Sequence, residues 1–160
     1  MELLRIRSFT PHEARETASW SYDAPFDIYD GDPTCAHDLV NVDDAGFGYH
    51  ALVQGGHEEL VGFCCFGAEA RVRGQTAEDG TLDIGGGVRP DLVSHRIATQ
   101  ALPMIMAFAV ERFGPRRLRT AVATFNERST RLCRSAGFVI VRRFDRPGRE
   151  FQELVRTLER

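Results

Sequence analysis

A run of three glycines precedes a segment with helical periodicity. Leu82–Val88 has the composition of a strand, and Gly85–Gly87 lie inside it. Glycine in a strand often marks either a bulge or the close approach of a ligand. Beyond the turn at Arg89-Pro90, Ser94–Phe113 predicts the main helix. The first amides of a helix are unpaired and carry a partial positive charge, which favours the binding of an anionic group at such a helix end.

A second group of polar residues opens the next predicted helix. Asn126–Ala136 follows the basic strand Leu118–Thr124, and Gly137 is placed to end the helix at its C-terminal cap. The thiol of Cys133 lies within this helix. A thiol with a pKa of about 8.5 donates a proton more readily than a phenol near 10, although its reach is shorter.

Residues 82–138 together resemble the GCN5-related N-acetyltransferase family, whose members transfer an acyl group from coenzyme A. The glycine-rich strand, the turn after it, Asn126 and Gly137-Phe138 carry the resemblance, and the strand order of the whole chain agrees with it. The resemblance implies acetyl-CoA or another acyl-CoA as co-substrate, and no metal. Carried over to this sequence, the contacts with that cofactor fall on Gly87, Val88, Arg89, Ser94, His95, Arg96, Ile97, Ala98, Thr99, Asn126 and Ser129.

Three positions depart from the family pattern. The phosphate-binding turn of the family carries Arg or Gln, two variable residues, Gly, one variable residue and then Gly or Ala. This pattern falls on Val93–Ala98, where Ala98 agrees and Val93 and Arg96 do not. Arg96 could block the pyrophosphate or pair with it. The family also has a tyrosine seven residues after the Asn, which protonates the departing thiolate, and Cys133 occupies that position. The resemblance therefore implies Cys133 as the proton donor.

Asp83 is the first choice for a general base that takes a proton from the amine. The resemblance points to it, because this strand supplies the acid/base carboxylate in many members of the family. Alternation along the strand puts Asp83 and Ile84 on opposite faces. We expect His95 to be an exposed residue of the first helical turn, and His50 to be a surface or satisfied polar residue.

Aromatic residues gather in and just before the long segment Ser21–Phe47. A segment of this length without a strand usually serves a function or contains a short helix. Family members use this region as a lid on the acceptor side, so the resemblance implies that these residues line the pocket of a small amine substrate. Filling of the core is the alternative. The residues concerned are Trp20, Tyr22, Phe26 and Tyr29.

The composition excludes several kinds of chemistry. All 20 basic residues are arginine, so a Schiff base and a lysine-bearing phosphate loop are excluded. The five histidines and four cysteines show no metal-ligand spacing, and free thiols indicate a reducing cytoplasm. No segment is long and apolar enough for a membrane span. Residues 1–88 have 5 Arg against 16 acidic residues, and residues 89–160 have 15 against 7. The basic half suggests an anionic ligand.

The sequence also suggests two alternatives to a transferase. Nucleic-acid binding is disfavoured, because Arg116–Arg119 is short and the net charge is −3. A repurposed or inactive member of the same fold, with a cleft that binds a small molecule or does other chemistry, stays open because of the departures at Arg96 and Cys133. The remaining arginines of the closing hairpin are expected to be solvated or to face a substrate; they are Arg142, Arg143, Arg146 and Arg149.

The predicted elements alternate in the order β-α-β-β-β-α-β-α-β-β. Thr10-Pro11-His12-Glu13 has the form of a capping box for the first helix, with Thr10 as the N-cap. The turn Gln54–His57 predicts a hairpin between the second and third strands. The fold class is therefore α+β, with a mixed sheet, and the resemblance implies the three-layer arrangement of the family. Residues 1–160 are expected to form a single domain, and a homodimer is left open.

Overall fold

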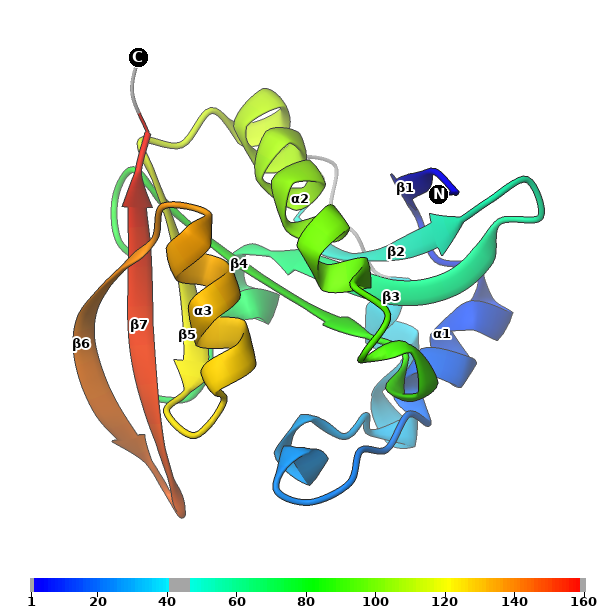
Figure 1. Cartoon of the computed structure of the whole chain (residues 1–160), viewed down its shortest axis with the longest axis horizontal. Coiled ribbons are helices and arrows are strands. Elements are labelled where there is room, and N and C mark those ends of the chain that lie inside the picture. The colour runs from blue at the N-terminus through cyan, green and yellow to red at the C-terminus, as the bar shows by residue number, and fades with distance from the viewer. Residues whose placement is uncertain (1, 41–46, 159–160) are drawn as a thin grey trace. The chain divides into compact units, whose positions relative to one another are not determined.

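The computed structural model describes residues 2–40 and 47–158. Its α-helices and strands, in chain order, are β1 (Leu4–Arg7), α1 (Pro11–Ala18), β2 (Gly48–Gln54), β3 (Glu59–Phe66), β4 (Thr81–Val88), α2 (Ile97–Phe113), β5 (Arg117–Ala123), α3 (Glu127–Ser135), β6 (Val139–Arg146) and β7 (Arg149–Thr157). The strands form one open mixed sheet in the order β1-β2-β3-β4-β5-β7-β6, with β4 and β5 parallel (Figure 1). The predicted element order and the α+β class are confirmed.

The chain forms two compact units. The first unit is Met1–Cys65 with Gly86–Ala101, and the second unit is Phe66–Gly85 with Leu102–Arg160. The strand β4 and the helix α2 each contribute one part to either unit.

The first unit begins with the predicted capping box. The Thr10 hydroxyl accepts from the Glu13 amide at 3.2 Å, and the Glu13 carboxylate accepts from the Thr10 amide at 3.0 Å. Arg7 also donates to Glu13 at 2.8 Å. These hydrogen bonds, the one from Arg7 foremost, lower the pKa of Glu13 to about 2. The capping box is confirmed, and it fixes the start of α1.

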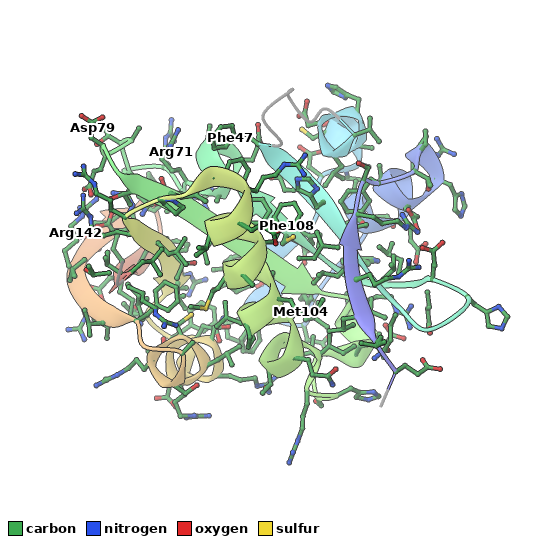
Figure 2. All side chains as sticks on the ribbon, turned by 90° about the horizontal axis from the view of Figure 1, so that it is seen from above. Phe47, Arg71, Asp79, Met104, Phe108 and Arg142 are labelled. Carbon is green, nitrogen blue, oxygen red and sulfur yellow. The ribbon has the colours of Figure 1, made fainter. Side chains whose placement is uncertain are left out.

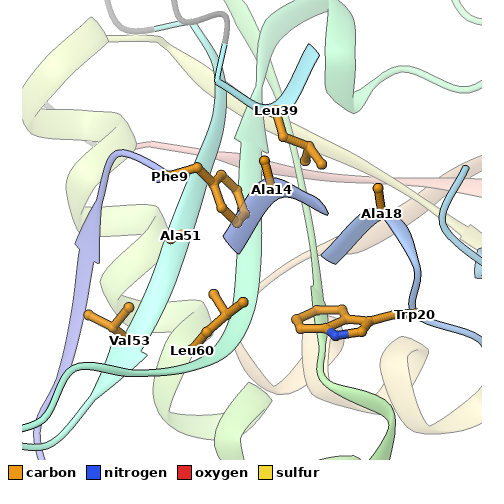
Figure 3. Packing of buried hydrophobic residues seen from close by; sticks show 8 residues of the cluster. All are labelled: Phe9, Ala14, Ala18, Trp20, Leu39, Ala51, Val53 and Leu60. Carbon is orange, nitrogen blue, oxygen red and sulfur yellow. The ribbon is translucent and has the colours of Figure 1, made fainter. Parts of the chain in front are cut away.

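A hydrophobic cluster holds the first unit together (Figure 3). Trp20 and Phe9 pack there with small residues of α1, with Leu39 and with the strand residues Ala51, Val53 and Leu60. Between α1 and β2, the long segment contains two 3₁₀ helices, η1 (Phe26–Tyr29) and η2 (Pro33–Leu39). The expectation of a short helix in Ser21–Phe47 is confirmed for its described part, and residues 41–46 lie outside the described residues.

The strands of the second unit have one apolar face and one charged face. Leu82, Leu118 and Leu154 lie on the apolar face, which α3 covers: Gln152 donates to the Thr130 hydroxyl at 2.7 Å. Arg156, on the same face, donates to the carbonyl of Ala136 at the end of α3, also at 2.7 Å. The segment 71–80 covers the charged face, which carries Asp83, Arg119 and Glu153.

The helix α2 begins later than the sequence predicts. Its first residue is Ile97 instead of Ser94. The reason is Arg96, whose φ of +61° lies in the left-handed region and is incompatible with a right-handed helix. Residues 90–92 form a short 3₁₀ helix, η4 (Pro90–Leu92), ahead of this turn.

Candidate active site

The glycines of β4 allow close packing within the first unit. A Cβ atom on Gly87 would lie 2.6 Å from Cε1 of Phe63. A Cβ on Gly62 of the neighbouring strand would lie 2.5 Å from the carbonyl oxygen of Gly87. Real Cβ atoms essentially never come that close, so both positions need glycine. The end of β4 is therefore held close to β3 and to the Phe63 ring, in a continuous strand that ends at Val88.

Arg89 is tied to the protein by acidic side chains and backbone. Its Nε donates to Asp91 at 2.7 Å, and its Nη1 donates to Glu59 at 3.1 Å and to the Leu60 carbonyl at 2.8 Å. The backbone amide of Arg89 also donates to the Val61 carbonyl at 2.9 Å. This predicted cofactor contact thus joins the end of β4 to β3 and to η4, and so fixes the direction of the chain into the following turn.

The turn from Val93 to Arg96 leads into α2 with its side chains exposed. Ser94, His95, Arg96 and Thr99 are exposed, Ala98 is half-buried, and Ile97 is buried at 3% exposure. Arg96 adopts the left-handed backbone conformation at the position where the family pattern has glycine. Glycine adopts this conformation without steric cost, so the turn here has the backbone that glycine favours. The first-turn amides of α2 have no intrahelical acceptor, and such an exposed helix start fits a pyrophosphate.

Tyr22 connects the aromatic segment to the end of β4. Its hydroxyl donates to the Val88 carbonyl at 2.7 Å, and its amide donates to Asp30 at 2.7 Å. Burial, with the nearby Asp30 charge, raises the pKa of Tyr22 to about 12, so the phenol stays protonated and remains a donor. Tyr22 is thereby brought together with a predicted cofactor residue, 66 positions away in the sequence.

The other aromatic residues of this group lie in different surroundings. Trp20 is 8% exposed and belongs to the hydrophobic cluster, where its ring lies 6.4 Å from that of Phe63. Phe26 and Tyr29 lie on η1, the first half-buried and the second 38% exposed. Trp20 is therefore a core residue, which is the alternative that the sequence had left open.

Asn126 is the N-cap of α3 in the second unit. Its side-chain oxygen accepts from the Ser129 amide at 3.2 Å, and its carbonyl accepts from the Thr130 hydroxyl at 2.9 Å. Asn126 is 7% exposed. Asn126 and Ser129, two of the residues that the resemblance assigned to the cofactor, are thus brought together by the helix cap. The sequence pattern of an Asn opening a helix is the signal for this role.

Cys133 is buried in α3. Its exposure is 8%, and burial raises the pKa of its thiol to about 11. Its carbonyl accepts from the Phe138 amide at 3.0 Å, beyond the helix end. Gly137 has a φ of +93° and donates to the Arg134 carbonyl at 3.0 Å, so the predicted C-terminal cap at Gly137 is confirmed.

Asp83 is surrounded by arginine. Its Oδ1 accepts from Nε of Arg119 at 2.6 Å, and its Oδ2 accepts from Arg119 at 3.1 Å and from Arg71 at 3.0 Å. Asp83 and Arg119 are directly opposite each other in the parallel pair β4–β5, and both are 2% exposed. Both carboxylate oxygens already accept hydrogen bonds from guanidinium groups, so the side chain of Asp83 is held in place.

The same cluster continues across the charged face of the second unit. Arg142 donates to both oxygens of Glu153, at 2.8 and 2.9 Å, and Gln75 donates to Glu153 at 3.0 Å. Arg119 also donates to the Thr76 carbonyl at 2.7 Å and pairs with Glu78 at 3.0 Å. Figure 2 labels Arg71 and Arg142 from this cluster. The sequence prediction missed Arg119 and Glu153, because both strands carry further charged residues and nothing local marks these two as buried.

Metal-binding groups, membrane-spanning helices and disulfides can be assessed for the residues that the structure describes. Within residues 2–40 and 47–158, no three His, Cys, Asp or Glu side chains are grouped so that they could hold a metal ion. None of the helices described is long and apolar enough to cross a bilayer. All four cysteines are free thiols.

The chain thus has a mixed seven-stranded sheet whose glycine-rich strand β4 leads, through the turn at Arg96, to the exposed start of α2. Residues 4–139 match the model of the acetyltransferase (GNAT) domain family. The chain belongs to this family, the GCN5-related N-acetyltransferases, and is an acyltransferase. No curated protein matches the chain in sequence.

Solved structures with the same fold are distant in sequence. An acetyltransferase of the GNAT family from Bacillus anthracis superposes with a TM-score of 0.75 at 16% identity, covering 98% of both chains. Mutant forms of the spermidine/spermine N-acetyltransferase of Vibrio cholerae give 0.70 at 14% identity, covering 97% of this chain and 95% of theirs. The ribosomal-protein-S5-alanine acetyltransferase from Vibrio fischeri gives 0.67 at 12%, covering 98% and 96%. The last two enzymes are named for a polyamine and for a protein, so the fold alone does not select the acceptor.

Proposed function

We propose that residues 1–160 act as one domain that transfers an acyl group, with acetyl as the first candidate, from acyl-CoA to a small amine. The amine attacks the thioester directly in a sequential complex, without a covalent enzyme intermediate. The observation that carries the proposal is the turn at Arg96. It keeps the backbone conformation that glycine favours where the family has glycine, and it leads into an exposed start of α2.

The residues of the turn would hold the diphosphate of the cofactor. The amides of Ile97, Ala98 and Thr99 are the donors, and the exposed guanidinium of Arg96 adds a charge. When bound, acyl-CoA supplies the activated thioester. Backbone groups at Gly87 and Val88 bind its pantetheine arm, and Tyr22 keeps the Val88 carbonyl in a fixed direction. Proximity and backbone donors account for most of the rate enhancement in such a scheme.

The two side chains predicted to move protons, Asp83 and Cys133, have different roles in this proposal. Asp83 does not take the proton of the amine in this proposal, because Arg119 and Arg71 already donate to both of its oxygens. Asp83 holds these two arginines in place, and the proton of the ammonium group goes to solvent water. Cys133 remains the candidate donor to the leaving thiolate, with a thiol whose pKa of about 11 makes it a weak acid at neutral pH. Ser129 and Asn126, at the start of the same helix, orient the cofactor in this scheme.

The acceptor is proposed to be a small amine, which is cationic before it loses its proton. The segment from Trp20 to Val40 carries five aspartates and no arginine, so it attracts cations. The relative from Vibrio cholerae that acts on spermidine and spermine shows that the fold accommodates such a molecule. Free thiols at Cys64, Cys65 and Cys133 support a reducing compartment, and we place the protein in the cytoplasm.

A second candidate is a repurposed family member that does not use acetyl-CoA. It is favoured by the departures at Val93, Arg96 and Cys133. Thermal unfolding with and without acetyl-CoA separates the two candidates. At 100 times its Kd, a ligand of the native state adds about 2.7 kcal/mol, which raises Tm by roughly 5–10 °C for a chain of this size. An unchanged Tm at millimolar acetyl-CoA would rule out the transferase proposal.

Arg96 provides the sharper test. If its guanidinium pairs with phosphate, Arg96→Gly and Arg96→Ala should both weaken acetyl-CoA binding by about 10-fold or more. The free energy of unfolding of Arg96→Gly should also be about 1 kcal/mol higher than that of Arg96→Ala, because only glycine adopts the left-handed conformation without strain. Calorimetric titration measures the first quantity and urea unfolding the second. Tighter binding in both variants would mean that Arg96 obstructs the cofactor.

A further inference from the structure

The closing hairpin of the second unit sets two like charges against each other. Pro147 and Gly148 form its turn, and Gly148 has the positive φ of 82° that a type II turn needs after proline. Arg146 and Arg149 are therefore direct partners across the antiparallel pair. Like charges in that relation destabilise a sheet, because their side chains leave on the same face.

Nothing in the described part of the chain neutralises this pair. Neither guanidinium forms an ion pair with a carboxylate of residues 2–40 or 47–158. The Nε of Arg149 is buried and has no hydrogen-bond partner. Each group rests on an aromatic ring instead: Cζ of Arg146 lies 6.0 Å from the ring centre of Phe151, and Cζ of Arg149 lies 5.1 Å from that of Phe125. The rings hold the cations in place but leave the charges uncompensated.

The two acidic residues nearest the turn lie on the other face of the hairpin. Asp145 and Glu150 are partners in the preceding pair of the ladder, and so leave on the opposite face from Arg146 and Arg149. Arg142 lies on the same face as Arg146 and Arg149, but its guanidinium is already paired with Glu153 through two hydrogen bonds. An arrangement with one charge of each sign in every pair would be more stable. The hairpin instead presents two adjacent guanidinium groups that form no ion pair with the described residues.

We propose that Arg146 and Arg149 bind a compact oxyanion, a carboxylate or phosphate group of a small molecule. Guanidinium forks match the geometry of such groups, and no carboxylate of the described residues forms an ion pair with either arginine. The oxyanion comes either from the acyl-CoA itself or from a separate molecule. The site goes beyond the proposed transfer reaction, because its argument uses no part of the acyl chemistry.

Side-chain NMR of the full chain tests the site directly. The ¹⁵N-labelled protein is titrated with inorganic phosphate and, separately, with acetate, and the Nε–H signals of its arginines are followed. The signal of Arg149 should shift and saturate. Arg146→Gln and Arg149→Gln should each raise the Kd about 10-fold or more. The matched control is Arg143→Gln, on the opposite face of the same hairpin, whose Kd should stay within about twofold of the parent.

A charge reversal separates binding from folding. Arg146→Glu places an opposite charge against Arg149, so it should raise Tm in phosphate-free buffer and abolish the rise that phosphate causes in the parent chain. Arg143→Glu should keep the rise caused by phosphate. A signal of Arg149 that does not saturate, or an equal loss of affinity in the Arg143 and Arg146 variants, would overturn the proposal, because attraction to the overall charge would then explain the binding.

Saturating coenzyme A identifies the source of the oxyanion. If coenzyme A displaces phosphate from Arg149, the cofactor supplies the oxyanion. If coenzyme A and phosphate bind at the same time, the oxyanion belongs to a separate molecule. Either result leaves the site in place. The result is also independent of the proposed function: a chain that binds phosphate at Arg149 but is not stabilised by acetyl-CoA keeps the oxyanion site and loses the transferase proposal.

Discussion

At the scale of single residues, burial decides what Cys133 can do. Its thiol is 8% exposed on α3, and its pKa is raised to about 11 by that burial. At neutral pH it is almost entirely protonated, so it can give a proton but does not act as a nucleophile. A donor weaker than the thiol that it must protonate contributes little driving force.

Cys133 should also make stability depend on pH. The thiol of the unfolded chain ionises near its ordinary pKa of about 9, whereas the folded one ionises only near 11. Its contribution is therefore fully present below pH 9 and is lost as the pH rises to 11. At pH 10 the loss is about 1 kcal/mol. Urea unfolding at pH 7 and pH 10 should show a larger decrease for the parent chain than for Cys133→Ala. Equal decreases would show that the buried thiol ionises freely.

Turnover gives the second measurement on Cys133. If the thiol protonates the leaving thiolate, Cys133→Ala lowers turnover by about 10²–10⁴-fold with little change in acetyl-CoA affinity. A packing role predicts lost stability and unchanged turnover per folded molecule.

At the scale of elements, the start of α3 does two jobs. The side chain of Asn126 satisfies the Ser129 amide at the first turn, and its backbone carbonyl accepts from Thr130. The family pattern places a cofactor contact at the same Asn. A residue that caps a helix cannot be removed without loosening that helix, so a variant at Asn126 tests the proposed cofactor contact only when its stability is measured as well.

We expect Asn126→Ala to lower the free energy of unfolding by about 1 kcal/mol, within the range of 0.5–2 kcal/mol known for lost caps. Asn126→Asp keeps a capping oxygen and should retain most of the stability. If Asn126 also contacts the cofactor, coenzyme A affinity falls in Asn126→Ala by more than the loss of folded protein explains. Urea unfolding and calorimetric titration at a temperature where both variants are folded separate these effects. Full stability in Asn126→Ala would show that the cap is dispensable.

At the scale of the whole molecule, global unfolding must break a buried ionic cluster. Arg119 and Asp83 are each 2% exposed, and Glu153 is 3% exposed. The segment 71–80 is held to the charged face by this cluster, through Arg71, Gln75 and the Thr76 carbonyl. Removing one partner leaves the others charged and buried, which costs far more than the loss of a surface pair.

Asp83→Ala should therefore destabilise the protein by about 3–5 kcal/mol. The double variant Asp83→Leu with Arg119→Met, which replaces the pair by apolar side chains, should recover most of this loss. Arg131→Met removes an exposed pair with Glu127 on α3 and serves as a control, with a change within about 0.5 kcal/mol. Chemical unfolding measures all three. A double variant no more stable than Asp83→Ala would mean that the two residues do not act as a pair.

Local signals in the sequence predicted the elements, and distant contacts limited the site. The capping box at Thr10, the cap at Gly137 and the order of helices and strands along the chain depend on neighbouring residues, and these predictions are confirmed. The bond from Tyr22 to Val88 and the register that places Asp83 opposite Arg119 depend on residues far apart in the chain. The left-handed turn at Arg96 contradicts the local preference of arginine, so the sequence placed the helix start three residues too early.

The edge strand β6 affects how the protein behaves at high concentration. β6 ends the strand order, and its ladder with β7 is irregular between Ile140 and Arg142, with exposed valines at 139 and 141. A regular apolar edge would template the addition of strands from other molecules and lead to fibrils. The irregularity twists the edge away from such a template, and the arginines along it repel a second copy. The chain should thus remain dispersed at high concentration, and deleting Val141 should make it precipitate.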